Sequence, residues 1–278
     1  MQDWKQEVFE RNPYMLAEYR AQRQGESLHR RIRIGMTLLC HYRILHREPP
    51  CFVYGEAEAW TYSGRQDTAC LQMLLECFDL VSFDIFDTLL LRTCRKAMGV
   101  FEQIERERGW HGFAKARVHA ERLAREQQRC QSDTSEVTLR QIYQHLPEFW
   151  RDTQAELYAE QAACFANPVF LPVIKKLRRD GIRIICLSDM YLPSDFLQLL
   201  INKAGYPQFE QVIVSCEAGC SKDQGNLFTR LSQAFPGKQI IHIGDNLYSD
   251  YIQARRHGIS AVLYRPESPR RKGTVRYD

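Results

Sequence analysis

The segment LVSFDIFDTLL, residues 80–90, is the clearest indication of the fold, because a short apolar segment in it runs into two acids. An apolar run of this length is typical of a buried strand in a parallel sheet. In open α/β sheets, ligands bind beyond the carboxyl ends of the strands. We therefore expect Asp84, which directly follows the apolar run, to lie at the functional edge of such a sheet.

The chain after residue 180 alternates between apolar strands and helices. The expected strands are residues 182–187, 211–215, 240–243 and 260–264, and the expected helices are residues 193–204, 223–234 and 247–257. Strands that alternate with helices predict an α/β fold in which a parallel sheet carries helices on both faces.

Helical patterns dominate the rest of the chain. Residues 96–180 read as almost continuous helix, whereas residues 51–62 are ambiguous, with a short strand as one reading. The expected organisation is a mostly helical N-terminal region of unknown role at 1–78, a core at 79–95 and 168–265, a helical insertion at 96–167 and a basic tail at 266–278.

Each of the first four strands expected after residue 78 is followed by residues suited to phosphate chemistry. They are Asp84 and Asp87, then Ser188, then Lys222, and finally Asp245 and Asp250. Paired acids such as Asp84 and Asp245 offer hard oxygen ligands to Mg²⁺. Lys222 and the Ser188 hydroxyl can hold phosphate oxygens and neutralise charge in the transition state. This set predicts phosphoryl transfer, with Asp84 as the attacking carboxylate.

In this order the motifs resemble those of the haloacid dehalogenase (HAD) superfamily. The matching segments are FDIFDTLL around Asp84, ICLSDM around Ser188, SKDQGNLF around Lys222 and IGDNLYSD around Asp245 and Asp250. The resemblance implies a Rossmannoid core over residues 79–265, with a helical C1-type cap at 96–167 that selects a small substrate. FDIFDTLL, with TLRQIY at 138–143 and LSDMYL at 187–192, also resembles a branch often encoded beside bacterial surface-polysaccharide enzymes.

The resemblance also implies residue roles. Asp84 would form an aspartyl-phosphate, and the backbone carbonyl of Phe86 would bind Mg²⁺ beside Asp84 and Asp245. Asp250 would support the metal site or orient Lys222. The phosphate-binding candidates are Ser188, Lys222 and Thr88.

One departure from the family pattern concerns the general acid. Most phosphatases of the superfamily carry a second Asp two residues after the nucleophile, where this chain has Phe86, which cannot transfer a proton. Asp87 could substitute if its side chain turned inward. The alternative is a catalytically degenerate domain that binds or regulates. A dehalogenase is a further alternative, although Asp245 and Asp250 favour a metal site, which dehalogenases do not need.

Arg117, Glu121 and Arg125 are spaced at i, i+4 and i+8 within the expected cap. This spacing favours a ladder of ion pairs on a solvated helix face. The second interpretation places an arginine over the active site, where it holds the leaving group of the substrate.

Composition and charge narrow the class of protein. The chain has 278 residues, 44% hydrophobic and 26% charged, which is typical of globular proteins and excludes a disordered or fibrous chain. No apolar run approaches the roughly 20 residues that cross a bilayer, and no secretory signal is visible. The ten cysteines form no C-x-x-C pair, so reduced thiols in a cytoplasmic protein are expected.

The positive charge lies mainly outside the motif-bearing region. Residues 20–47 hold seven arginines and one glutamate, although the whole chain has a formal charge of only +4. A solvated arginine-rich face is the favoured interpretation of this segment, and an anionic surface or a protein partner is the second. Nucleic-acid binding is disfavoured because the segment has few aromatic residues and no known motif.

Overall fold

The fold is described by a computed structural model over residues 27, 29–30, 59–62, 68–94 and 97–265. The helices expected before residue 51, most of the basic segment 20–47 and the tail 266–278 lie outside the described residues. Within the described part, no helix is long and apolar enough to cross a membrane.

Six parallel strands form the central sheet. They are β1 (Ala59–Tyr62), β2 (Leu80–Phe83), β5 (Arg183–Ser188), β6 (Gln211–Val214), β7 (Ile240–Gly244) and β8 (Ser260–Tyr264). Their order is β1-β8-β7-β2-β5-β6, and every neighbouring pair is parallel. The predicted α/β fold is therefore confirmed. One edge strand, β1, comes from the region 1–78.

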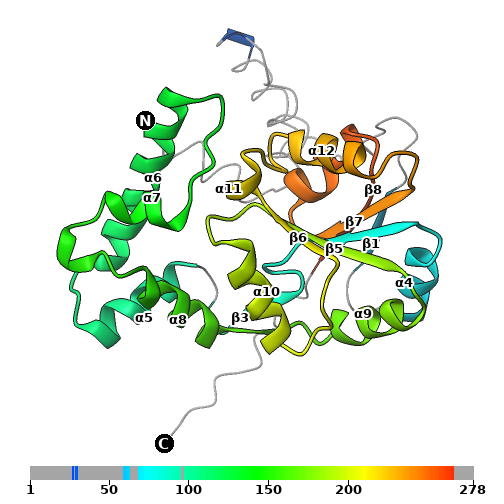
Figure 1. Ribbon diagram of the computed structural model, residues 1–278, viewed down its shortest axis with the longest axis horizontal. Helices are drawn as coiled ribbons and strands as arrows, with labels where there is room; N and C mark the ends of the chain where they lie inside the picture. Colours follow the sequence, from blue (N-terminus) through cyan, green and yellow to red (C-terminus); the bar gives the residue numbers. More distant parts are fainter. Residues whose placement is uncertain (1–26, 28, 31–58, 63–67, 95–96, 266–278) are drawn as a thin grey trace, which may run out of the picture.

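Helices cover both faces of this sheet (Figure 1). Helices α4 (Thr68–Leu75), α9 (Phe170–Arg179) and α10 (Ser194–Lys203) share one apolar cluster with Val81 and Phe83 of β2. Helices α12 (Asn226–Ala234) and α13 (Gln253–Arg256) share another cluster with Leu80. Because successive side chains of a strand point to opposite faces, this double cover explains the continuous apolar run that opens β2.

A helical insert interrupts the core between two short antiparallel strands, β3 (Leu90–Arg92) and β4 (Cys164–Ala166). The insert, residues 98–163, comprises α5 (Met98–Arg108), α6 (Phe113–Gln131), α7 (Leu139–Gln144), a 3₁₀ turn (Glu148–Trp150) and α8 (Thr153–Ala163). Figure 1 shows it beside the sheet as a separate group of helices. The expectation of nearly continuous helix over residues 96–180 missed β4, because three residues are too few to display the strand period.

Two helices near the carboxyl edge of the sheet differ from the expectation. Helix α12 begins at Asn226 and not at 223, because Gly225 has a φ of +81°, which is not helical. Glycine is required at this position, since a Cβ there would lie 1.9 Å from the His257 ring. The helix expected at 247–257 is a π-helix (η3, Leu247–Ile252) followed by α13. A further short helix, α11 (Ser215–Ala218), follows β6. Single π turns are frequent at functional sites, and this one carries Asp250.

Candidate functional site

The carboxyl ends of β2, β5 and β7 open into a cavity of about 490 Å³. Asp84 follows β2, Ser188 ends β5 and Asp245 follows β7, and all three line the cavity. The Asp84 backbone N–H donates to the Ile243 carbonyl at 2.8 Å, which fixes Asp84 beside the carboxyl end of β7. Parallel pairing therefore brings together residues that are more than 150 positions apart in the chain.

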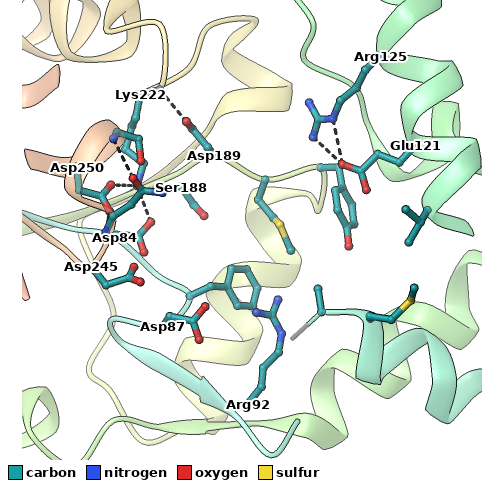
Figure 2. Close-up of a pocket in the computed structure, with 18 of the residues that line it drawn as sticks. Asp84, Asp87, Arg92, Glu121, Arg125, Ser188, Asp189, Lys222, Asp245 and Asp250 are labelled. Atoms are coloured by element: carbon teal, nitrogen blue, oxygen red, sulfur yellow. Dashed lines mark hydrogen bonds and ion pairs between the residues drawn. The ribbon is translucent and has the colours of Figure 1, made fainter. Parts of the chain in front are cut away.

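Three carboxylates and one ammonium group form the centre of the site (Figure 2). One oxygen from each of Asp84, Asp245 and Asp250 lies within 4.8 Å of the others. The Lys222 Nζ atom donates to Asp84 Oδ1 and to Asp250 Oδ1, both at 2.5 Å. The structure thus brings together four of the residues predicted from sequence to carry catalysis or metal binding.

The charge of this cluster is suited to a cation. Burial raises the pKa of Asp84 to about 7 and that of Asp245 to about 8, although Lys222 opposes both shifts. Three carboxylates face a single lysine, so their charge is not balanced within the cluster. Carboxylate oxygens are the ligands that Mg²⁺ prefers, and the donor set therefore fits a divalent cation.

Asp250 is engaged by protein donors on both of its oxygens. Oδ1 accepts a hydrogen bond from Lys222 Nζ and lies 3.3 Å from His242 Nε2, and Oδ2 accepts from the Asn246 N–H at 2.9 Å. Although burial opposes the shift, Lys222 and His242 hold the pKa of Asp250 below its usual range. Gly244 permits this position, since a Cβ there would lie 2.3 Å from Asp250 Cγ. Asp250 therefore contacts Lys222 directly, and the same ammonium group contacts Asp84.

His242 is a site residue that the sequence did not indicate. Its fully buried ring joins Asp250 to the Ser82 hydroxyl, which lies 2.9 Å from Nδ1. The available signal was a histidine inside an otherwise apolar strand, Ile240–Gly244. On sequence alone, such a histidine cannot be distinguished from an ordinary core residue.

Ser188 and Thr88, both predicted to bind phosphate, occupy different places. Ser188 lines the cavity. Thr88 is fully buried, its hydroxyl lies 3.5 Å from Asp245 Oδ1, and it is not among the residues that line the cavity. Asp189 accepts hydrogen bonds from the backbone N–H groups of Lys222 and Asp223, at 2.8 and 3.0 Å, and so holds the loop that carries the lysine.

Phe86 and Asp87, which follow the nucleophile candidate Asp84 after Ile85, both line the cavity. Asp87 has a φ of +59°, in the left-handed region, and Figure 2 shows its carboxylate beside Asp245. The Arg92 guanidinium lies 4.0 Å from the centre of the Phe86 ring and forms two hydrogen bonds with Glu160, at 3.0 and 3.2 Å. Arg92 was not singled out from the sequence, because its contacts depend on the pairing of β3 with β4.

The opposite wall of the cavity comes from α6 of the helical insert. Glu121 and Arg125 line the cavity and are paired at 2.9 Å, and Figure 2 shows them across from Lys222. The ladder expected from their spacing exists, since Arg117 also contacts Glu121, at 3.2 Å. The expected solvated face is wrong, however, because Arg117 is fully buried against Glu156, at 2.6 Å. Closely packed α8 supplies that carboxylate, which no pattern within α6 could reveal.

Tyr191, which follows β5 of the core, contacts the helical insert. Its backbone carbonyl accepts a hydrogen bond from the Leu139 N–H of α7 at 2.8 Å, and the Arg117 guanidinium lies 4.7 Å from its ring centre. Within the described part of the chain, its phenol oxygen is the buried side-chain polar atom without a hydrogen-bond partner. Tyr191 therefore joins the core to the helical insert mainly through packing.

Comparisons with known proteins bear on the family and the fold of the chain. The family model of haloacid dehalogenase-like hydrolases matches residues 78–258, whereas no curated protein sequence matches the chain. A HAD-family enzyme of Bacteroides thetaiotaomicron is 15% identical and superposes with a TM-score of 0.50, over 70% of this chain and 97% of its own. A 2-haloacid dehalogenase of Pseudomonas syringae pv. tomato DC3000 is 16% identical, with a TM-score of 0.50 over 67% of this chain and 86% of its own.

The Bacteroides enzyme has also been solved in complex with magnesium and inorganic phosphate, at 16% identity and a TM-score of 0.45 over 69% of this chain and 96% of its own. At these identities the solved structures support the fold alone. The family match, in contrast, spans well over half of the chain and contains all four of its sequence motifs. The chain therefore belongs to the haloacid dehalogenase-like hydrolase family.

Proposed function

We propose that this hydrolase is a Mg²⁺-dependent phosphatase or phosphotransferase that acts on a small phosphorylated metabolite such as a sugar phosphate. The observation that carries the proposal is the contact of Lys222 with both Asp84 and Asp250, beside the carboxylate of Asp245. A carboxylate nucleophile, a fixed cation and a site for a divalent metal are the parts that phosphoryl transfer requires.

Asp84 is the nucleophile in this proposal. Lys222 binds its Oδ1 atom, which leaves Oδ2 to attack phosphorus. The bond from phosphorus to the leaving oxygen then breaks, and its electron pair leaves with that oxygen, which takes up a proton. Water attacks phosphorus of the aspartyl-phosphate, releases inorganic phosphate and restores the Asp84 carboxylate. In a phosphotransferase, the hydroxyl of an acceptor replaces this water.

The metal would be held by Asp84, Asp245 and the backbone carbonyl of Phe86, with Asp250 in support. When bound, Mg²⁺ neutralises charge on the phosphate oxygens. Lys222 and Ser188 supply the remaining contacts to the phosphoryl group. The Thr88 hydroxyl, which does not line the cavity, supports Asp245 through its contact with Oδ1.

Asp87 is the residue proposed to move the proton in place of Phe86. Its left-handed backbone turns the carboxylate toward the cavity, next to Asp245 (Figure 2). A left-handed conformation is tolerated by Asp more readily than by most residues other than glycine. The same carboxylate can protonate the leaving oxygen and later accept a proton from water.

The helical insert would act as a C1-type cap that closes over the cavity and selects the leaving group. The likeness of FDIFDTLL to polysaccharide-associated enzymes supports a carbohydrate setting. The proposal places the protein in the cytoplasm, where its eight described free cysteines would stay reduced.

The test is hydrolysis of an aryl phosphate by the purified protein with Mg²⁺, with a chelator, and by Asp84→Asn with Mg²⁺. We expect turnover only by the unaltered protein with Mg²⁺. Equal turnover in the three samples would refute the proposal.

Two other functions are distinguished by the same samples. A non-catalytic binding module is favoured by Phe86, whose ring is covered by Arg92. It predicts binding of Mg²⁺ and phosphate without turnover. A dehalogenase, also compatible with a non-acidic residue at Phe86, predicts halide release from a 2-haloacid that persists with the chelator.

A further inference from the structure

We infer that the part of the substrate that leaves with the oxygen carries no negative charge, and that Glu121 of the helical insert enforces this selectivity. The inference rests on the proposed phosphoryl-transfer function. It concerns the wall of the cavity opposite Asp84, where the leaving group must lie once the phosphoryl group is held at Lys222.

Every cation that lines the described part of the cavity is already paired. These cations are Lys222, Arg92 and Arg125. Lys222 lies 2.5 Å from Asp84 and from Asp250, and Arg92 holds Glu160 through two nitrogens at 3.0 and 3.2 Å. A second anionic group on the substrate would need one of these pairs to break.

Arg125 lines the cavity from α6 of the helical insert, and all three of its guanidinium nitrogens are engaged. Nε and Nη2 contact Glu121 Oε1 at 3.0 and 2.9 Å, and Nη1 donates to the Ser135 carbonyl at 3.1 Å. Nη1 also lies 3.8 Å from Glu136 Oε1. The arginine is therefore held and neutralised by the insert itself.

The charges around the cavity also disfavour a second anion. Among the described residues, six carboxylates line the cavity against three cations, and they are Asp84, Asp87, Glu121, Asp189, Asp245 and Asp250. A divalent metal would reduce this excess, but it would act at the aspartate end. At the insert end, a carboxylate or a second phosphate would face Glu121, and among the described residues the cation there, Arg125, is already paired.

A neutral, hydroxylated leaving group meets suitable partners at the same wall. The Glu121 carboxylate accepts hydrogen bonds from hydroxyl groups, and apolar side chains lie around it, because Met98, Phe101 and Val118 also line the cavity. Carbon skeletons with hydroxyl groups present both kinds of surface. The geometry thus favours uncharged polyol or sugar monophosphates over bisphosphates and phosphorylated acids.

The experiment compares two aryl phosphates of nearly the same shape, neutral 4-carbamoylphenyl phosphate and anionic 4-carboxyphenyl phosphate. Because their phenols also differ somewhat as leaving groups, the preference is compared between variants as well as within the unaltered protein. With Mg²⁺, we expect kcat/KM to favour the neutral carbamoyl compound by about tenfold or more. In Glu121→Gln, which removes one negative charge and releases Arg125, we expect this preference to fall to about threefold or less.

Glu126→Gln is the matched control. Glu126 lies on the same helix, its side chain is 54% exposed, and it pairs with Arg122 at 4.0 Å outside the cavity. The ratio of kcat/KM for the neutral and the anionic compound in Glu126→Gln should equal that of the unaltered protein. Thermal unfolding of each variant checks folding. If Glu121→Gln does not fold, the ratio of kcat/KM for the two compounds in the unaltered protein still tests whether a charged leaving group is disfavoured.

The outcomes separate this inference from the proposed function. Hydrolysis of both compounds with equal or greater kcat/KM for the carboxylate would overturn the inference and leave the phosphatase proposal in place. If Glu121→Gln kept the same preference for the neutral compound, Glu121 would not be the cause of that preference. Hydrolysis of neither compound, nor of any simple aryl phosphate, would overturn the phosphatase proposal itself.

Discussion

Lys222 shows how much of the site depends on single atoms. Its Nζ atom joins Asp84 to Asp250, and its own backbone N–H is held by Asp189. Although burial opposes the shift, Asp250 and Asp84 raise the pKa of Lys222, so the ammonium form is retained at every working pH. A fixed, permanently charged group in a buried site stabilises developing negative charge without rearrangement.

Asp87→Asn tests the proposed proton transfer at the residue scale. We expect kcat for phenyl phosphate to fall about 100-fold, because an amide cannot protonate the leaving oxygen. For 4-nitrophenyl phosphate, whose leaving group needs no proton, the fall should be much smaller. Steady-state kinetics on both compounds measure the difference, and equal losses would argue against a proton-transfer role.

Tyr191→Phe tests the buried phenol that has no hydrogen-bond partner in the described part of the chain. Removing an unsatisfied buried hydroxyl should leave the free energy of unfolding unchanged or raise it by about 1 kcal/mol. Tyr143→Phe is the control, because the Tyr143 hydroxyl donates to Glu156 Oε2 at 2.9 Å, and its loss should cost about 1–3 kcal/mol. Urea unfolding of both variants checks the prediction, which fails if Tyr191→Phe is the less stable.

At the scale of elements, the helical insert is organised around a buried ion pair. Arg117 of α6 donates through Nε and Nη2 to Glu156 of α8, at 2.6 and 2.8 Å, and both side chains are fully buried. The guanidinium also lies 4.7 Å from the Phe101 ring centre of α5. One side chain therefore joins three helices, and it fixes the register of α6, on which Glu121 and Arg125 depend.

Arg117→Met should destabilise the protein by about 3–5 kcal/mol, because it leaves Glu156 buried without its partner. Arg122→Met, at a position 66% exposed on the same helix, should change the free energy of unfolding by less than about 0.5 kcal/mol. Adding Glu156→Met to Arg117→Met should recover most of the loss. Denaturant unfolding measures all three, and a small effect of Arg117→Met alone would contradict this account.

At the scale of the whole molecule, folding brings uncompensated acids together and so links stability to pH and to metal. Burial raises the pKa values of Asp84 and Asp245 from 3.8 to about 7 and about 8. Between the unfolded and folded values the folded state binds more protons than the unfolded state. Its stability therefore falls as pH rises through this window.

Without metal, the melting temperature should fall between about pH 6 and about pH 8, and Mg²⁺ should raise it more at the higher pH, where the carboxylates have lost their protons. Asp245→Asn should flatten the pH dependence and weaken the response to Mg²⁺. Differential scanning fluorimetry with Mg²⁺ or a chelator measures both. A stabilisation by Mg²⁺ that is equal at the two pH values would contradict the linkage.

The parallel α/β sheet and the polar residues at the ends of its strands follow from local features of the sequence. An apolar run such as residues 80–83 and a polar residue directly after it are local features, and the rule that carboxyl ends of parallel strands share one edge converts them into a site. That is why Asp84, Ser188 and Asp245 can be selected from the order of residues along the chain.

Which charges balance one another depends, in contrast, on how distant segments pack together. The burial of Arg117 against Glu156, the cover of Phe86 by Arg92 and the contact of His242 with Asp250 each join segments that no local pattern relates. The physical reason is that the energy of a charge depends on its surroundings, including burial and the nearest opposite charge, and these are properties of packing. The helical spacing of Arg117, Glu121 and Arg125 predicted their pairing, but packing alone determined that one end is buried and the other faces the cavity.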